Sequence, residues 1–241
     1  MVRWSLARCF LALALSVSIA ACSDDSGSTP TPDKDTGAPD TVLADQGPTP
    51  ETGPACEYPK GPYGTSEGKI VENFVFDGFA DAQYLCKSAK DQVMDLSATR
   101  KISFKDFYCN TGCSDKKRRL LWVMVSAGWC GPCHQEVMDT QAQYAKGAID
   151  AKVHLLNVIY EDDNAKPVTE SFTKLWAKNS KFNISFPIAM DPSFRMGAYF
   201  DRNAVPFNMI VDLDTMEIVF RQTGANLPAV GKAIFSYLGQ N

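Results

Sequence analysis

The chain has few histidines and no excess of basic residues. Among its 241 residues, His134 and His154 are the only histidines, and 24 Lys and Arg stand against 28 Asp and Glu, which gives a formal net charge of -4. This balance argues against nucleic-acid binding, because nucleic-acid-binding domains carry a basic patch or stripe. The one basic cluster, residues 116–119, is expected on a solvated turn before a buried strand. We find no internal repeat and, after the N-terminus, no further hydrophobic segment long enough to span a membrane.

The first 21 residues are typical of an export signal. Arg3 and Arg8 provide a positively charged start, and residues 9–21 form an apolar run that is short for a membrane span and ends in small residues. Residues 19–22, with the sequence IAAC, resemble the lipobox of bacterial lipoproteins, in which the cysteine is lipidated and becomes the new N-terminus. This resemblance implies a lipid anchor on Cys22. The alternative is an ordinary signal peptide followed by an incidental cysteine.

Residues 22–55 differ in composition from the sequence on either side. They are rich in Asp, Thr, Pro, Gly and Ser, contain almost no aliphatic residues, and hold seven acidic side chains against Lys34. Such a segment cannot bury enough apolar surface to offset the entropy of folding, so we expect a disordered acidic tether. The remaining residues, 56–241, have balanced charge and are numerous enough for one domain with a well-buried core.

Alternating apolar runs and amphipathic stretches predict an α/β domain. The run at 120–126 is continuously apolar, as expected of a central strand covered on both faces, and residues 153–160 are predicted to form a second buried strand. The last two expected strands are joined by a short turn and should be antiparallel. The expected strands are residues 69–76 and 102–107, which should lie at one edge of the sheet, and 120–126, 153–160, 207–211 and 216–222. The expected helices are residues 135–146, 168–178 and 227–238.

Cys130 and Cys133 form the clearest chemical motif. They are separated by Gly131 and Pro132, and they follow a buried strand at the start of a helix. The N-terminus of a helix presents unpaired N–H groups and the positive end of its dipole, and both favour a thiolate over a thiol. A thiolate is the nucleophile of thiol–disulfide exchange. We therefore assign the attack to Cys130, which comes first and should be more exposed, and the resolution of the mixed disulfide to Cys133.

The sequence WCGPC at residues 129–133 is the active-site motif of the thioredoxin superfamily in full, and the chain resembles that family over roughly residues 65–240. The order of the expected elements also matches, and the later Val205-Pro206 matches the family's cis-proline position. The resemblance implies a thioredoxin fold, with a central mixed β-sheet flanked by helices and an N-terminal β extension. It also implies that Pro206 is cis and that Trp129, Val205 and Pro206 contact the substrate.

Other features are most similar to the TlpA/ResA branch of exported thioredoxin-like proteins: the upstream extension, the tether, and the connection rich in Asp and Lys at 161–167. Cytosolic thioredoxins place a buried acid six residues before the first active-site cysteine, where this chain has Met124. ResA-like proteins instead place a glutamate three residues after the second cysteine, which is Glu136 here. At this spacing Glu136 and Cys133 share a helix face, so Glu136 is expected to have a raised pKa and to accept the proton of Cys133. An exposed glutamate in the first helical turn is the alternative.

The sequence CGPCH at residues 130–134 also matches the C-x-x-C-H pattern of c-type haem attachment. Pro132, the buried strand before the motif and the matching Pro206 far downstream argue against haem. We therefore expect no cofactor.

Four other cysteines, Cys56, Cys86, Cys109 and Cys113, are candidates for structural disulfides, because an even number of cysteines in an exported protein favours pairing. Four cysteines allow three connectivities. We prefer Cys56 with Cys86 and Cys109 with Cys113, and the crossed pairings remain open. The alternative for Cys109 and Cys113 is a second redox pair or a metal site. Copper-delivery relatives place C-x-x-x-C where this chain has C-x-x-C and add a distant histidine that this chain lacks, so we expect no metal.

Together these features predict a thiol–disulfide oxidoreductase that exchanges electrons with dithiols and disulfides of other proteins. The Gly-Pro dipeptide resembles that of reducing thioredoxins, so a protein-disulfide reductase is preferred. The alternatives are a binding protein that carries a structural disulfide on the same scaffold, and a thiol peroxidase. The expected partners are protein thiols and disulfides, an electron donor or acceptor protein, and a membrane through the lipid anchor. The domain is expected in the periplasm or on the cell exterior.

Overall fold

The structure is a computed structural model, and it describes residues 56–87, 91–109, 113, 118–145, 147, 152–179 and 183–239. The expected signal peptide (1–21) and the expected tether with Cys22 (22–55) lie outside these residues. Within the described part of the chain, no helix combines the length and the apolar character needed to cross a membrane.

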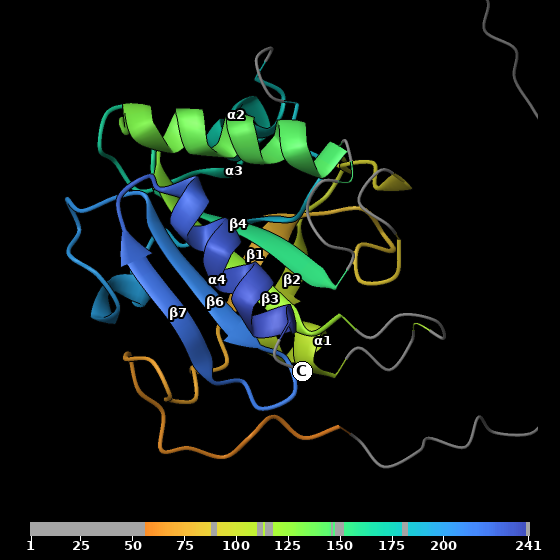
Figure 1. The fold of residues 1–241 in the computed structure, drawn as a ribbon. Helices are drawn as coiled ribbons and strands as arrows, with labels where there is room; N and C mark the ends of the chain where they lie inside the picture. The colour runs from red at the N-terminus through yellow and green to blue at the C-terminus, as the bar shows by residue number, and fades with distance from the viewer. Residues whose placement is uncertain are drawn as a thin grey trace, which may run out of the picture. The chain divides into compact units, whose positions relative to one another are not determined.

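A seven-stranded mixed sheet forms the centre of the domain (Figure 1), in the order β2-β1-β5-β4-β3-β6-β7. Its strands are β1 (Val75–Phe79), β2 (Arg100–Ser103), β3 (Leu120–Ala127), β4 (Val153–Glu161), β5 (Ile188–Met190), β6 (Phe207–Asp212) and β7 (Ile218–Thr223). β4 is parallel to β3 and β5, whereas β6 is antiparallel to β3 and β7, as expected for the last two strands. The expected α/β class is thus confirmed. β5 was not predicted, because three apolar residues carry too little periodicity to indicate a strand.

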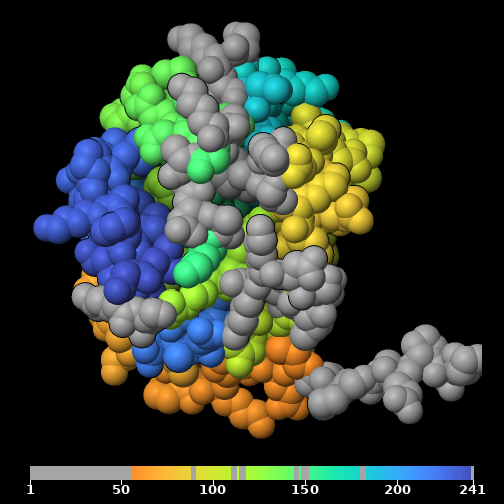
Figure 2. All heavy atoms as spheres, turned by 45° about the vertical axis from the view of Figure 1, so that its right-hand side comes forward, coloured from red at the N-terminus to blue at the C-terminus, as the bar shows by residue number. Residues whose placement is uncertain are grey.

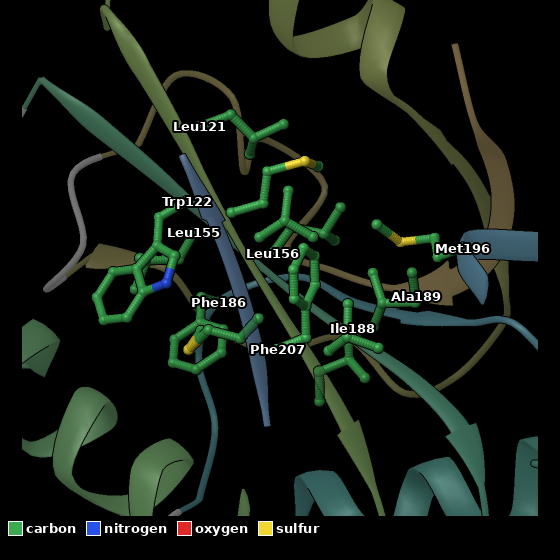
Figure 3. Packing of buried hydrophobic residues seen from close by; sticks show 14 of the residues in the cluster. Leu121, Trp122, Leu155, Leu156, Phe186, Ile188, Ala189, Met196 and Phe207 are labelled. Atoms are coloured by element: carbon green, nitrogen blue, oxygen red, sulfur yellow. The ribbon is translucent and has the colours of Figure 1, made fainter. Parts of the chain in front are cut away.

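Three helices cover one face of this sheet: α2 (Gly131–Ala145), α3 (Glu170–Ala177) and α4 (Leu227–Gly239). Trp122 of β3 forms part of a cavity wall between α2 and α4, which are neighbours in the space-filling view (Figure 2). Asn157 of β4 accepts a hydrogen bond from the indole of Trp176 in α3. Because Trp122 pairs with Leu155 across the strands, Trp122 and Asn157 share one face of the sheet. Figure 3 shows Trp122 beside Leu155 and Phe186, with Met196 on the opposite side of the strands.

The opposite face of the sheet is covered by aromatic side chains. The short 3-10 helix η2 (Arg195–Ala198) and the chain beside it lie over this face. Ring contacts form two groups on this face, one of Phe74, Phe76, Phe104 and Tyr199 and the other of Tyr160, Phe194, Phe200 and Phe207. Because both faces are covered, β3 and β4 are buried along their whole length, which explains why apolar residues dominate their sequences.

The upstream extension places β1 and β2 at one edge of the sheet, as expected, but the predicted strand at 102–107 is wrong beyond Ser103. The helix α1 (Phe104–Tyr108) begins there instead. The Ser103 hydroxyl accepts from the N–H of Asp106, and the Asp106 carboxylate accepts from the N–H of Ser103. This capping box satisfies two backbone donors at once and starts the helix.

The predicted strand at 69–76 is also displaced. Only its last two residues belong to β1, and the earlier part lies at the far edge of the sheet, beside β7. There Ile70 bridges Glu217, and the N–H of Gly68 donates to the Ile218 carbonyl at 2.8 Å. The extension therefore pairs with both edges of the sheet.

Two disulfides fasten this extension, Cys56–Cys109 and Cys86–Cys113, with Cα–Cα distances of 5.6 and 5.1 Å. The pairing preferred from the sequence, Cys56 with Cys86 and Cys109 with Cys113, is therefore wrong, and a crossed pairing is found. The reason lies in α1. Cys109 caps the C-terminus of this helix, which carries it to Cys56, so that Cys113 meets Cys86 instead. Neither a second redox pair nor a metal site is formed by Cys109 and Cys113, because each is bonded to another cysteine.

The basic cluster at 116–119 also differs from expectation at Arg118. Its side chain is buried rather than solvated, at 7% exposure, and one guanidinium nitrogen lies 2.7 Å from Nδ1 of the buried His154. Burial and the nearby guanidinium lower the pKa of His154 well below its usual value. His154 is therefore a neutral core residue, held beneath the extension.

Candidate active site

β3 leads through a short turn into α2, and the C-x-x-C motif opens this helix. Cys130 and Cys133 are joined by a disulfide with a Cα–Cα distance of 5.2 Å, so the structure describes the oxidised form. Cys133 is fully buried, whereas Cys130 keeps an exposed fraction of 3%. The order of exposure agrees with the assignment of Cys130 as the attacking residue.

The first turn of α2 surrounds Cys130 with backbone donors. The N–H of Cys133 lies 3.1 Å from the Cys130 sulfur, and the N–H groups of Cys133 and His134 donate to the Cys130 carbonyl. After reduction, the same N–H and the positive end of the helix dipole stabilise a thiolate on Cys130. The local backbone thus favours the nucleophilic form of this cysteine.

The peptide bond between Val205 and Pro206 is cis, as the family resemblance implied. The register of the sheet places this proline beside the active-site turn. Phe207 pairs with Val125, and Pro206 lies one step further along, where β3 approaches its end. Val205 is half-buried. The cysteine pair and the cis-proline, two segments far apart in sequence, therefore meet at one end of the two strands.

Trp129 is held at this end by a carboxylate from the neighbouring strand. Its indole N–H donates to Glu161 at 2.7 Å, while 37% of the residue stays exposed. The other oxygen of Glu161 accepts from two guanidinium nitrogens of Arg202, at 2.8 and 2.5 Å. Glu161 is itself buried, so it links the active-site turn to the loop that precedes Val205. Trp129 is therefore held by a hydrogen bond to a carboxylate that is itself paired with Arg202.

Glu136 is 1% exposed, which excludes the alternative of a solvated first-turn glutamate. Its Oε1 accepts a 2.8 Å hydrogen bond from the amide of Asn208, a residue of β6. Asn208 is paired across the strands with Met124, the residue found where cytosolic thioredoxins have their buried acid. Burial raises the pKa of Glu136 to about 7, and the bond from Asn208 lowers it only in part. A buried carboxyl thus lies on the helix that carries Cys133, and the paired strand position is occupied by Met124.

His134 has structural partners on both sides. Its Nε2 lies 2.7 Å from the carbonyl oxygen of Gly128, and its ring packs at 4.5 Å from that of Trp176. The two cysteines of the C-x-x-C-H pattern are bonded to each other within a packed helical turn. This arrangement does not suit haem attachment, which requires two accessible free thiols. Among the described residues, no group of His, Cys, Asp and Glu is arranged to hold a metal ion.

Sequence reasoning missed three residues of the site: Asn208, Glu161 and Arg202. Asn208 is a polar residue inside an otherwise apolar strand, two positions after the cis-proline, and that interruption was an available signal. Glu161 ends β4 at the edge of the Asp- and Lys-rich connection, where one more acid does not stand out. Arg202 lies in a loop and gives no periodic signal.

A cavity of about 530 Å³ between α2 and α4 is lined by none of the sequence-predicted site residues.

The buried carboxyl of Glu136 makes the stability of the oxidised protein depend on pH. Its pKa is raised from 4.5 to about 7 on folding, so the folded state binds a proton that the unfolded state releases in this range. The contribution of Glu136 to the free energy of unfolding should fall by about 3 kcal/mol as the pH rises from 4.5 to 7, and then level off. The lowered pKa of His154 contributes an opposite rise below its ordinary pKa of 6.5, so the contribution of Glu136 is read as the difference between the wild type and Glu136→Gln. Urea unfolding of the oxidised protein across this range measures the fall.

Glu136→Gln should remove this component, because an amide cannot ionise. Glu170→Gln is the matched control, since Glu170 is an exposed carboxylate of α3 paired with Lys174. An unchanged pH dependence in Glu136→Gln would show that Glu136 is not the titrating group.

No protein-family model matches the chain, and a comparison with curated proteins finds no significant match. Solved structures do resemble it. AhpC from Mycobacterium bovis has a TM-score of 0.51 at 14% identity, over 73% of this chain and 94% of that one. AhpC from Enterococcus faecalis has a TM-score of 0.50 at 16% identity, over 71% and 92%. A DsbF homologue from Corynebacterium diphtheriae has a TM-score of 0.47 at 15% identity, over 75% and 98%. With its strand order, the helix that follows β3 and the cis-proline before β6, the chain has a thioredoxin fold.

Proposed function

We propose that the protein is a thiol–disulfide oxidoreductase that reduces disulfides of other proteins outside the cytoplasm. The observation that carries this proposal is the Cys130–Cys133 pair at the start of α2, with the Cys133 N–H directed at the Cys130 sulfur. A backbone donor and the helix dipole at the same sulfur are the features that lower a thiol pKa and make a cysteine reactive. A disulfide with a purely structural role needs neither of them.

In the reductive direction, the Cys130 thiolate attacks one sulfur of a substrate disulfide. A bond forms between Cys130 and that sulfur, the substrate S–S bond breaks, and the departing substrate thiolate takes up a proton. Cys133 then attacks Cys130 and releases the second substrate sulfur as a thiolate. The substrate has gained two electrons, and the protein is left with the Cys130–Cys133 disulfide that the structure describes. An electron donor protein must then restore the two thiols.

Glu136 is proposed as the proton acceptor for Cys133. Cys133 is fully buried, so its thiol cannot pass its proton directly to solvent. Glu136 lies three residues further along α2, which brings the two side chains onto one helix face. A carboxyl with a pKa of about 7 is ionised often enough at neutral pH to accept this proton and is basic enough to compete for it.

Trp129, Val205 and Pro206 are proposed to contact the substrate. They surround the end of β3 at which Cys130 lies, and Trp129 is partly exposed. The family resemblance implies that an extended substrate segment pairs its backbone with the loop at Val205. Glu161 keeps Trp129 in place beside this loop through its bond to the indole.

The first test captures the substrate. Cys133→Ala cannot resolve the mixed disulfide, so we expect it to accumulate Cys130-linked partner proteins that are released by dithiothreitol. Cys130→Ala is the control and should capture none. Insulin reduction by dithiothreitol-reduced protein should be lost in both variants. Full insulin reduction by Cys130→Ala would contradict the proposed chemistry.

The two alternatives predict different results. A binding protein with a permanent disulfide requires a reduction potential of Cys130–Cys133 far below that of any available donor, which a glutathione titration measures. A thiol peroxidase requires turnover that depends on peroxide. The AhpC likeness, at 14 and 16% identity, shows the fold alone and does not favour this activity.

The second test concerns the proton acceptor. The resolution step in the wild type should become faster as the pH rises through about 7, because only ionised Glu136 accepts a proton. In Glu136→Gln this rise in rate with pH should disappear. The resolution step at pH 7 should be slower than in the wild type by about a hundredfold, a typical contribution of general base catalysis. Stopped-flow kinetics of a model disulfide over pH 5–9 measures the profile, with Glu170→Gln as control. An unchanged profile would remove Glu136 from the mechanism while leaving the cysteine chemistry intact.

The proposed location is a membrane surface outside the cytoplasm, with the domain on a tether from lipidated Cys22. Its support is the signal-like segment at 1–21 and the lipobox resemblance. When the full chain is produced in bacteria with labelled palmitate, the protein should be labelled and sediment with membranes. Cys22→Ser should abolish both effects. Cys9→Ser should change neither, because Cys9 lies in the signal that is removed.

A further inference from the structure

A chain of two hydrogen bonds runs through the core from β3 to α2. The indole N–H of Trp122 donates to Oδ1 of Asn208 at 2.7 Å, and Nδ2 of Asn208 donates to Oε1 of Glu136 at 2.8 Å. Trp122 is 4% exposed, Asn208 is fully buried and Glu136 is 1% exposed. Bulk water therefore does not compete for these bonds.

The indole of Trp122 fixes the donor–acceptor direction of both hydrogen bonds. An indole nitrogen is a donor only, so the atom of Asn208 that faces Trp122 must be its carbonyl oxygen. The amide nitrogen of Asn208 must then face Glu136. The orientation of an asparagine amide is ordinarily assigned from its surroundings, and here a donor-only neighbour leaves a single choice.

This direction determines which oxygen of Glu136 carries the proton. Oε1 accepts a hydrogen bond from Asn208, and a proton on Oε1 would make it a hydroxyl oxygen, which accepts that bond much more weakly than a carbonyl oxygen does. The other oxygen, Oε2, is buried and has no hydrogen-bond partner among the described residues. It is therefore the oxygen that is free to take up and release a proton.

We propose that Trp122 is a positioning residue that orients the amide of Asn208, so that Glu136 exchanges its proton only at Oε2. This inference rests on the proposed function, because it refines the role of Glu136 as the proton acceptor for Cys133. Trp122 touches neither cysteine in this role and acts through Asn208.

The local environment makes Glu136 sensitive to this arrangement. Its pKa has two causes, burial, which raises it, and the bond from Asn208, which lowers it; no neighbouring charge contributes. On its own helix, the nearby titratable residues are the two cysteines, which are bonded to each other, His134, which contacts the Gly128 carbonyl, and Asp139, which accepts from Gln135; none of them is a cause of the shift. From the sheet beneath, Asn208 and its cross-strand partner Met124 do not titrate. If the indole N–H is lost, the amide can turn and present its oxygen to Glu136, which favours the protonated carboxyl.

The inference can be tested on the oxidised protein without any substrate. The pKa of Glu136 is measured from the ¹³C shift of its side-chain carboxyl in the purified protein, and assigned by comparison with Glu136→Gln. Asn208→Leu removes the donor and should raise this pKa by about one unit. Trp122→Phe keeps an aromatic ring but removes the N–H, and should raise the pKa in the same direction. The double variant should match Asn208→Leu alone, because both changes act through one bond.

The chain offers a matched control. Trp176 donates its indole N–H to Asn157 at 3.0 Å on the same face of the sheet, so Trp176→Phe breaks an equivalent bond that does not lead to Glu136. It should leave the pKa of Glu136 unchanged. If Trp122→Phe does not fold, benzothienylalanine at position 122 replaces the N–H with sulfur and keeps the ring shape.

An unchanged pKa in Trp122→Phe or in Asn208→Leu, or a double variant in which the two shifts add, would overturn the inference. An equal shift in Trp176→Phe would do the same. Each of these outcomes is separate from failure of the proposed function. Failure of the proposed function is seen in insulin reduction by Cys130→Ala, and failure of the proton-acceptor role in the exchange kinetics of Glu136→Gln. The NMR measurement concerns only the pKa of the Glu136 carboxyl in the oxidised protein.

Discussion

The antiparallel pairing of β3 with β6 is the constraint on which the site depends. It sets Phe207 opposite Val125 and so brings the cis-proline to the end of β3, next to the cysteine turn. It also sets Asn208 opposite Met124, beneath the helix that carries Glu136. A shift of one residue in this register would turn Asn208 to the aromatic face and leave the buried carboxyl without its donor. The same register therefore positions both the cis-proline beside the cysteines and the hydrogen-bond donor of Glu136.

The carboxyl of Glu136 is balanced between two opposing effects. Complete burial without a donor would keep it protonated at neutral pH, while several donors would keep it ionised well below neutral pH. One hydrogen bond from Asn208, set against nearly complete burial, leaves its pKa near 7. Burial of this carboxyl lowers the stability of the oxidised protein above its pKa. The buried strands at the centre of the sheet and the two further disulfides offset this loss. The energetic cost at this position is therefore the burial of the Glu136 carboxyl group.

Much of this fold follows from the sequence, because the decisive signals are local. The continuous apolar run at 120–126 identifies β3, and the largely apolar segment at 153–160 identifies β4. The short turn identifies the antiparallel pair β6 and β7, and the position of the C-x-x-C motif identifies the start of α2. The capping box at Ser103 was also local, but the apolar residues after it resemble a strand. The disulfide pairing, the buried Arg118 and the role of Asn208 depend on residues far apart in sequence. Periodicity contains no information about such contacts, and only the register and the packing reveal them.

The disulfide between Cys56 and Cys109 has a mechanical consequence for any force applied to the domain from its N-terminal side. Cys56 precedes every strand and helix of the domain, and it is covalently bonded to Cys109 at the end of α1. A pull on the chain at this point is transmitted through the disulfide to Cys109. The intervening segment, including the hydrogen bond from Gly68 to Ile218 at the edge of the sheet, is bypassed. Tension from the N-terminal side therefore reaches the domain as a load on a covalent bond, and the strands are not peeled apart one hydrogen bond at a time.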